Sequence, residues 1–307
     1  MFQIKEILLM LFISIILMSA LTPFVDRLEK FKFPRVLAIT VVYIVLSLLI
    51  GAIIATIVPG LVDQTGKLVR LLPSALEKVR LIGINQQDIS REIITQVGAL
   101  PSNFVKITVS LFSNIIGVIS TLVITFYLLF ERRNLHKHLT QLLGNNHPDK
   151  IIRAVNLIEV RLGSWVRGEL FLMFIIGILT YIGLLILGID IALPLAVLAG
   201  LLEIIPNIGS IVSAVPAVLI ALTIHPLVAV AVVALYFLVQ LLENNLIIPH
   251  VMRQATGINP LVSIVALLIG FKLAGPAGAV LSLPSVIIIE TILTEVFSSS
   301  RFSSLAK

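Results

Sequence analysis

Long apolar runs are the feature that most constrains what this chain can fold into. Several exceed about 18 residues, the length that marks a helix able to cross a bilayer. Hydrophobic residues make up 58% of the 307 positions and charged residues only 12%, against about 25% charged in a typical globular chain. Because lipid cannot satisfy backbone polar groups, spanning segments of this kind must be helical. The sequence therefore predicts an all-α, polytopic integral membrane protein of about 7–8 transmembrane helices, with a re-entrant helical hairpin and amphipathic surface helices.

Composition and missing motifs exclude several classes of function. The chain has no cysteine, so disulfides, thiolate metal sites and cysteine nucleophiles are ruled out. The net charge of +6 comes from positive residues beside the apolar runs, as in cytoplasmic loops, and no basic patch interleaved with aromatics suggests nucleic acid. Zinc-protease, serine-hydrolase and ATP-binding signatures are absent, and His136 and His138 lack further metal ligands. We therefore expect no enzyme activity, no cofactor and no metal, with transport energy drawn from a gradient or a partner.

Polar intervals divide the chain into segments of alternating character. We expect N-terminal transmembrane helices over 1–59, an extracytoplasmic amphipathic linker over 60–103, a transmembrane helix over 104–130, a basic cytoplasmic loop with an interfacial helix over 131–168, a transport core over 169–297 and a cytoplasmic tail over 298–307.

Local signals set the expected helix ends in the first half of the chain. Pro23 should close the first span, and Pro59-Gly60 should end the second. Gly168 should open a new span after the interfacial helix, whose Trp165 is expected at the membrane interface.

The apolar stretch 191–260 is interrupted in a way that matters inside a bilayer. If a helix enters at Ala192, Glu203 lies eleven residues in, or about 17 Å at ~1.5 Å per residue. The hydrocarbon core is ~30 Å thick, so Glu203 and the break at 206–209 would lie near its middle. The chain could then turn back as a re-entrant hairpin, or both legs could span fully with a cytoplasmic turn between them.

Polar residues beside these breaks are the candidate substrate- or ion-binding residues. A charge at a helix centre costs about 2.5–3.5 kcal/mol, so Glu203 needs a partner, a proton or water, or else it is a neutral structural acid. The spacing of Gln240, Glu243 and Asn244 places all three on one helix face, as a solute-binding cluster or as an interhelical hydrogen-bond clamp. The full candidate set is Glu203, Pro206, Asn207, Gly209, Gln240, Glu243, Asn244, Pro249 and Pro260.

The order and spacing of these motifs resemble a known family. The matching features are Pro34-Arg35, residues 127–133 with their basic end, Gly168, Glu203-Ile-Ile-Pro206-Asn-Ile-Gly209, Gln240-Leu-Leu-Glu243-Asn, Pro249 and Gly257-Ile-Asn-Pro260-Leu. Over nearly the whole chain the sequence is similar to the autoinducer-2 exporter family, also described as PerM-like permeases. That family usually carries another apolar helix before the segment that opens this sequence.

The resemblance implies a multi-pass transporter of small solutes in the bacterial inner (plasma) membrane, and a homo-oligomer, with a pentamer among the candidate assemblies. Some relatives are described as exporting autoinducer-2, and others as exchanging sodium for protons. The leading hypothesis is therefore a gradient-driven secondary transporter that exports a small polar solute. The alternatives are a Na⁺(cation)/H⁺ antiporter of the same family and, from another class, a membrane scaffold that anchors partners through residues 60–103.

Overall fold

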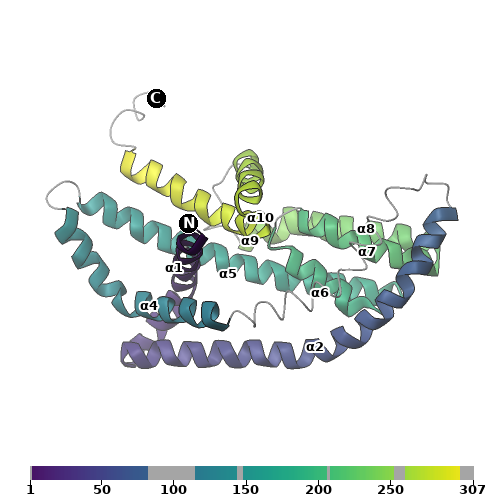
Figure 1. Ribbon diagram of the computed structural model, residues 1–307, viewed down its shortest axis with the longest axis horizontal. Coiled ribbons are helices and arrows are strands. Elements are labelled where there is room, and N and C mark those ends of the chain that lie inside the picture. Colours follow the sequence, from purple (N-terminus) through teal and green to yellow (C-terminus); the bar gives the residue numbers. More distant parts are fainter. Residues whose placement is uncertain (1, 82–114, 144–147, 206–207, 252–259, 298–307) are drawn as a thin grey trace. The chain divides into compact units, whose positions relative to one another are not determined.

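The computed structural model describes residues 2–81, 115–143, 148–205, 208–251 and 260–297, and every regular element in these ranges is a helix (Figure 1). Five helical segments are long and apolar enough to cross a membrane: Glu6–Lys30, Arg35–Gly60, Lys150–Ile186, Pro226–Val251 and Leu261–Glu295. The predicted all-α, polytopic membrane protein is thereby confirmed, while a total of about 7–8 spans stays a prediction.

The helices belong to two compact units, Met1–Ser47 with Ile115–Gly168 and Met252–Lys307, and Leu48–Asn114 with Glu169–Val251. The first unit contains α1 (Phe2–Lys30), α4 (Ile115–Leu143), α10 (Pro260–Ile292), the π-helix η2 (Leu293–Phe297) and the first parts of α2 (Arg35–Leu81) and α5 (Pro148–Ile186). The second contains the remaining parts of α2 and α5 with α6 (Ala192–Leu202), α7 (Ile208–Ile224), α8 (Pro226–Leu242), the π-helix η1 (Glu243–Ile247) and α9 (Ile248–Val251).

The first unit is held by an apolar core and by ion pairs at one end of it. Helix α1 packs along α4, and their contact is part of a core that includes Val25, Ile39 and Leu129. Arg132 on α4 donates from Nε to Glu159 Oε2 at 2.7 Å and from Nη1 to Asp26 at 3.1 Å. Arg132 therefore links three helices through partly buried, charge-assisted hydrogen bonds.

Helix α1 does not end at Pro23, so that prediction is wrong. Proline has no amide to donate to the carbonyl four residues earlier, which here belongs to Ser19. Gly163 of α5 lies directly against the Ser19 carbonyl, and Arg167 donates to the adjacent Ala20 carbonyl at 3.1 Å. The close contact with a neighbouring helix and the arginine donor stabilise the backbone around Pro23, so the helix continues through it.

The helix end predicted at Pro59-Gly60 is also absent, and helix α2 continues through both residues to Leu81. The second half of α2 contacts the start of α6. A Cβ on Gly60 would lie 2.8 Å from Leu193, and the Leu193 amide donates to Gln64 Oε1 at 3.2 Å. The second half of the predicted linker, residues 82–103, lies outside the described residues.

Helix α5 is continuous through Gly168, which was expected to open a new span. Trp165 is only 8% exposed, so it packs inside its unit, and its position at the membrane interface stays a prediction. One face of α5 is thus buried by packing on both sides of Gly168, with Leu162 before it and Leu172 after it. Tertiary packing along this face favours one long helix over the two that local pattern suggested.

In the second unit, α7 packs against both α6 and α8 around an apolar core that includes Leu195, Ile220 and Val232. Helix α6 begins at Ala192, as expected, and ends at Leu202. The 11 residues of α6 and the 17 of α7 extend about 17 Å and 26 Å, less than the ~30 Å hydrocarbon core. The predicted break after Glu203 is confirmed, whereas its re-entrant placement in the membrane stays a prediction.

Helix α10 consists of two helical legs joined at a kink. Within it, Ala274 and Gly275 leave helical geometry, and Gly275 has φ 62° and ψ −146°, a conformation essentially restricted to glycine. Gly270 and Gly278 lie backbone to backbone. Gly275 therefore turns the chain, and small residues let the two legs meet closely.

Candidate functional site

Two buried carboxyl groups meet inside the second unit. Glu203 directly follows the last residue of α6, Glu243 follows the last residue of α8, and each is only 1% exposed. Their side chains interact with each other. Because an ionised carboxylate only accepts hydrogen bonds, two carboxyls can bond to each other only when one of them carries a proton. The pair is therefore arranged to share a proton.

Each carboxyl of the pair has one further polar partner from the protein. Ser210, in the first turn of α7, donates from Oγ to Glu203 Oε2 at 2.8 Å. Gln240, on the last turn of α8, donates from Nε2 to Glu243 Oε2 at 3.1 Å. The predicted pairing of Gln240 with Glu243 is thus present. Ser210 was missed as a site residue, because its sequence context was considered only for nucleophilic chemistry.

Gly209 brings Ser210 up to Glu203. Its amide donates to the Ile205 carbonyl at 2.9 Å, and a Cβ at this position would collide with the Leu202 carbonyl and lie 2.8 Å from the Glu203 amide nitrogen. Only glycine lets the start of α7 approach the end of α6 this closely. Pro206 and Asn207, the other predicted residues of this break, lie outside the described residues.

A third buried acid, Glu169 on α5, belongs to the same group. It is 4% exposed and interacts electrostatically with both Glu203 and Glu243. Its Oε1 is buried and has no hydrogen-bond partner within the described part of the chain. Sequence reasoning missed Glu169, which stands at the polar edge of an apolar run and is indistinguishable there from a solvated flanking charge.

Close packing of α5 on α6 explains how Glu169 reaches Glu203. A Cβ on Gly200 would lie 2.6 Å from the Met173 carbonyl oxygen and 3.3 Å from the Gly177 Cα. Glu169 lies one turn before Met173 on α5, and Glu203 lies about one turn after Gly200 on α6, so the crossing places both acids on the same side of it. Gly177 and Gly200 thus let the two helices pack closely.

The π-helix η1 explains why the predicted cluster is incomplete. Glu243 begins this widened turn, in which the Ile248 amide bonds to the Glu243 carbonyl five residues earlier. Asn244 is exposed and does not join Gln240 and Glu243. Pro249 is exposed and lacks an amide, which removes one α-helical hydrogen bond from this region. Isolated π turns of this kind are frequent at functional sites.

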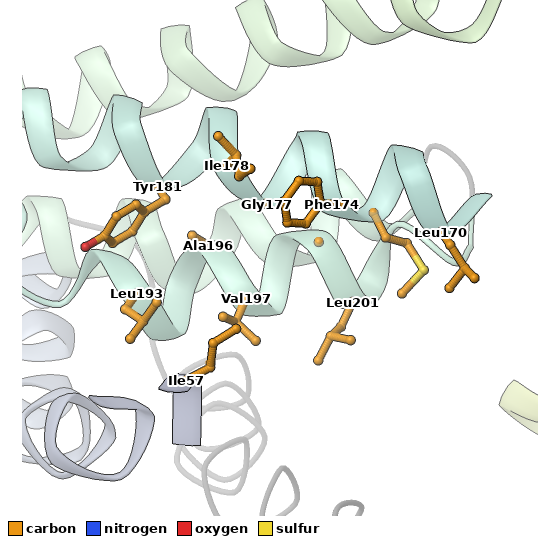
Figure 2. A pocket seen from close by; sticks show the side chains of 12 residues that line it. Ile57, Leu170, Phe174, Gly177, Ile178, Tyr181, Leu193, Ala196, Val197 and Leu201 are labelled. Carbon is orange, nitrogen blue, oxygen red and sulfur yellow. The ribbon is translucent and has the colours of Figure 1, made fainter. Parts of the chain in front are cut away.

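Beside α5 and α6 is an apolar pocket of about 340 Å³ (Figure 2). Its walls include Ile57 of α2, Phe174 and Tyr181 of α5, and Leu193 and Val197 of α6. Ligand pockets commonly begin at about 300 Å³ and carry a few convergent polar groups. Because the residues lining this one are almost wholly apolar, it does not suit a polar solute.

The remaining predicted site residue, Pro260, begins α10 in the other unit. Across the described ranges, no group of three or more histidine, aspartate or glutamate side chains is arranged to hold a metal ion. The arrangement of Glu169, Glu203 and Glu243 can instead hold and exchange protons, and accept hydrogen bonds from a ligand.

Interrupted apolar helices with buried, proton-sharing acids at the break define a polytopic membrane protein of the transporter class. Residues 1–298 match the AI-2E family transporter, so the chain belongs to this family. This membership implies a transport role rather than an enzymatic one.

Relatives cover most of the chain at modest identity. The chain is 26% identical over 305 residues to YrrI of Bacillus subtilis, provisionally named a transport protein, with 94% of this chain and 86% of YrrI covered. It is 26% identical over 292 residues to YhhT of Escherichia coli, also provisionally named a transport protein, with 92% and 81% covered. It is 24% identical over 300 residues to TqsA of Escherichia coli, named an AI-2 transport protein, with 95% and 86% covered.

Proposed function

We propose that this protein is a gradient-driven secondary transporter that exports a small polar solute and couples its movement to protons at the Glu203–Glu243 pair. The observation that carries the proposal is the meeting of two buried carboxyl groups, Glu203 and Glu243, at the break between α6 and α7. A proton held between two acids in an apolar unit can be released only if the pair separates or gains another partner. Solute binding and proton release are thereby linked.

In the coupling cycle, the solute competes with one carboxyl of the pair for the other. Ser210 and Gln240 donate to the pair while it holds its proton. A solute that hydrogen-bonds to either carboxyl weakens the bond between them and favours loss of the shared proton. Exchange of solute for proton across the membrane follows when the site opens alternately to each side. This scheme agrees with the name of TqsA, an AI-2 transport protein.

A second candidate is Na⁺(cation)/H⁺ antiport by the same residues. The shared proton favours antiport, because a monovalent cation can replace this proton at the carboxyl pair without any organic solute. In either case we propose that the protein acts as a homo-oligomer in the bacterial inner membrane, and its relatives from bacteria support a bacterial membrane protein.

Purified protein in liposomes that enclose a pH-sensitive dye tests the proposal. Glu203→Gln and Glu243→Gln each remove the acid and keep its shape, so we expect loss of proton movement driven by a solute gradient. Asp190→Asn is the matched control, because Asp190 is an exposed acid in the same unit. If a variant with both glutamine substitutions still shows wild-type flux, the carboxyl mechanism is refuted. A sodium gradient that alone moves protons in wild type would select antiport.

A further inference from the structure

The stretch 169–251, which builds the site, carries charged side chains of one sign only. Between residues 169 and 251 the sequence contains no lysine and no arginine, although the whole chain carries 22 of them. The same stretch contains Glu169, Asp190, Glu203 and Glu243. Three of these four acids are the buried ones that meet at the site, and Asp190 is exposed. The segment that builds the site therefore offers a ligand negative or neutral side chains only.

Within this site, Glu169 is the acid whose hydrogen bonding is incomplete. Glu203 and Glu243 interact with each other, and each accepts a hydrogen bond, from Ser210 or from Gln240. Oε1 of Glu169 has none of these among the described residues, although the side chain is 4% exposed. A buried oxygen left without a donor costs about 1–3 kcal/mol, which a ligand would relieve by donating to it.

We propose that Glu169 is a substrate-contacting residue and that the transported solute donates hydrogen bonds to it through an ammonium or hydroxyl group. An anion such as a carboxylate or phosphate is excluded, because it would lie beside three acids in an apolar surrounding with no arginine or lysine from this segment to pair with it. The inference rests on the proposed function and adds to it the chemical class of the solute.

The position of Glu169 suits this role. It comes from α5, whereas the proton-sharing acids end α6 and α8, so a solute held by Glu169 would contact the pair from a third helix. The close crossing at Gly200 fixes the approach of α5 to α6 independently of any ligand. A donor group bound between Glu169 and Glu203 would also compete with Glu243 for Glu203, which is the competition that coupling requires.

The test compares Glu169→Gln with Asp190→Asn in proteoliposomes, with proton movement driven in turn by gradients of ethanolamine, glycerol, sodium acetate and sodium phosphate, and with sodium chloride as the salt reference. Acetic acid and ethanolamine cross lipid in their neutral forms, so each response is measured relative to protein-free liposomes given the same gradient. In wild type and Asp190→Asn we expect a protein-dependent response to ethanolamine or glycerol and none to acetate or phosphate beyond that of the chloride salt. In Glu169→Gln we expect the KM for the responding solute to rise about ten- to hundredfold, as for loss of a charged hydrogen bond. Circular dichroism and thermal unfolding in detergent check that each variant is folded.

The outcomes separate this inference from the proposed function. An unchanged KM in Glu169→Gln, with flux still lost in Glu203→Gln, would overturn the role of Glu169 and leave the carboxyl pair in place. Saturable responses to acetate or phosphate, or no response to either donor solute, would overturn the assigned class. If Glu169→Gln does not fold, Glu169→Asp replaces it: it keeps the charge and withdraws the oxygens, and an unchanged KM would again refute the contact.

Discussion

Replacing Gly209 with alanine should open the break at which Glu203 is held. A Cβ here would overlap the Leu202 carbonyl and lie 2.8 Å from the Glu203 amide nitrogen. Both are backbone atoms of the last turn of α6, which cannot rotate away as a side chain can. Overpacking of this kind costs about 1–3 kcal/mol. We therefore expect Gly209→Ala to push α7 away from α6 and to separate Ser210 from Glu203.

Hydrogen exchange measured by mass spectrometry resolves this effect locally. In peptides that cover residues 199–213, exchange should accelerate by roughly 5- to 140-fold, the factor that corresponds to about 1–3 kcal/mol. Thermal unfolding in detergent should shift downward by a few degrees.

The matched control is Gly51→Ala on α2, where nothing lies within 4 Å of the added Cβ. This exposed helical site should be neutral or more stable by about 0.5–1 kcal/mol. If Gly209→Ala exchanges at the wild-type rate over 199–213, the steric reasoning is wrong and the contact between the helices is looser than described.

Three further changes test other parts of the structure. Ser210→Ala removes the 2.8 Å hydrogen bond to Glu203, and since a charged hydrogen bond contributes about 1.5–3 kcal/mol, solute-driven proton flux in liposomes should fall roughly tenfold or more. Gly275→Ala imposes φ 62° on a residue with a Cβ, so the midpoint of thermal unfolding should fall in line with about 1–3 kcal/mol of strain, and an unchanged midpoint would contradict this. Arg132→Ala leaves Glu159 buried without its partner, which should cost toward the lower end of ~3–5 kcal/mol, and a second change, Glu159→Gln, should restore part of the stability.

Sequence was sufficient where a helix is broken by the chemistry of its own backbone. The start of α6 at Ala192 and the break after Glu203 were both predicted, because glycine and proline act locally. Predictions at Pro23 and at Pro59-Gly60 were wrong for a related reason. There a neighbouring helix supports the backbone, as Gly163 and Arg167 do around Pro23, and such support depends on tertiary contacts that sequence spacing does not reveal.

For the site, sequence reasoning found the residues at interruptions and missed those inside continuous helices. Glu203, Gly209, Gln240 and Glu243 were predicted and are brought together. Asn244 was placed with them by α-helical spacing, which the π turn of η1 alters. Glu169 lies where α5 runs without a break, so only the crossing at Gly200 reveals that it points into the unit.

The crossing at Gly200 has one more consequence. Like charges repel, so acids on α5 and α6 would tend to drive these helices apart whenever Glu169 and Glu203 are both ionised. The backbone of α6 contacts that of α5 at Gly200, which has no side chain that could move aside, so the helices cannot approach more closely. Protonation of the acids or ligand binding therefore changes the force between two helices that are already in contact. Neutral acids let the helices close onto this contact, whereas ionised acids repel each other against the packing of the helices. A single glycine thus sets how closely the two acid-bearing helices approach each other.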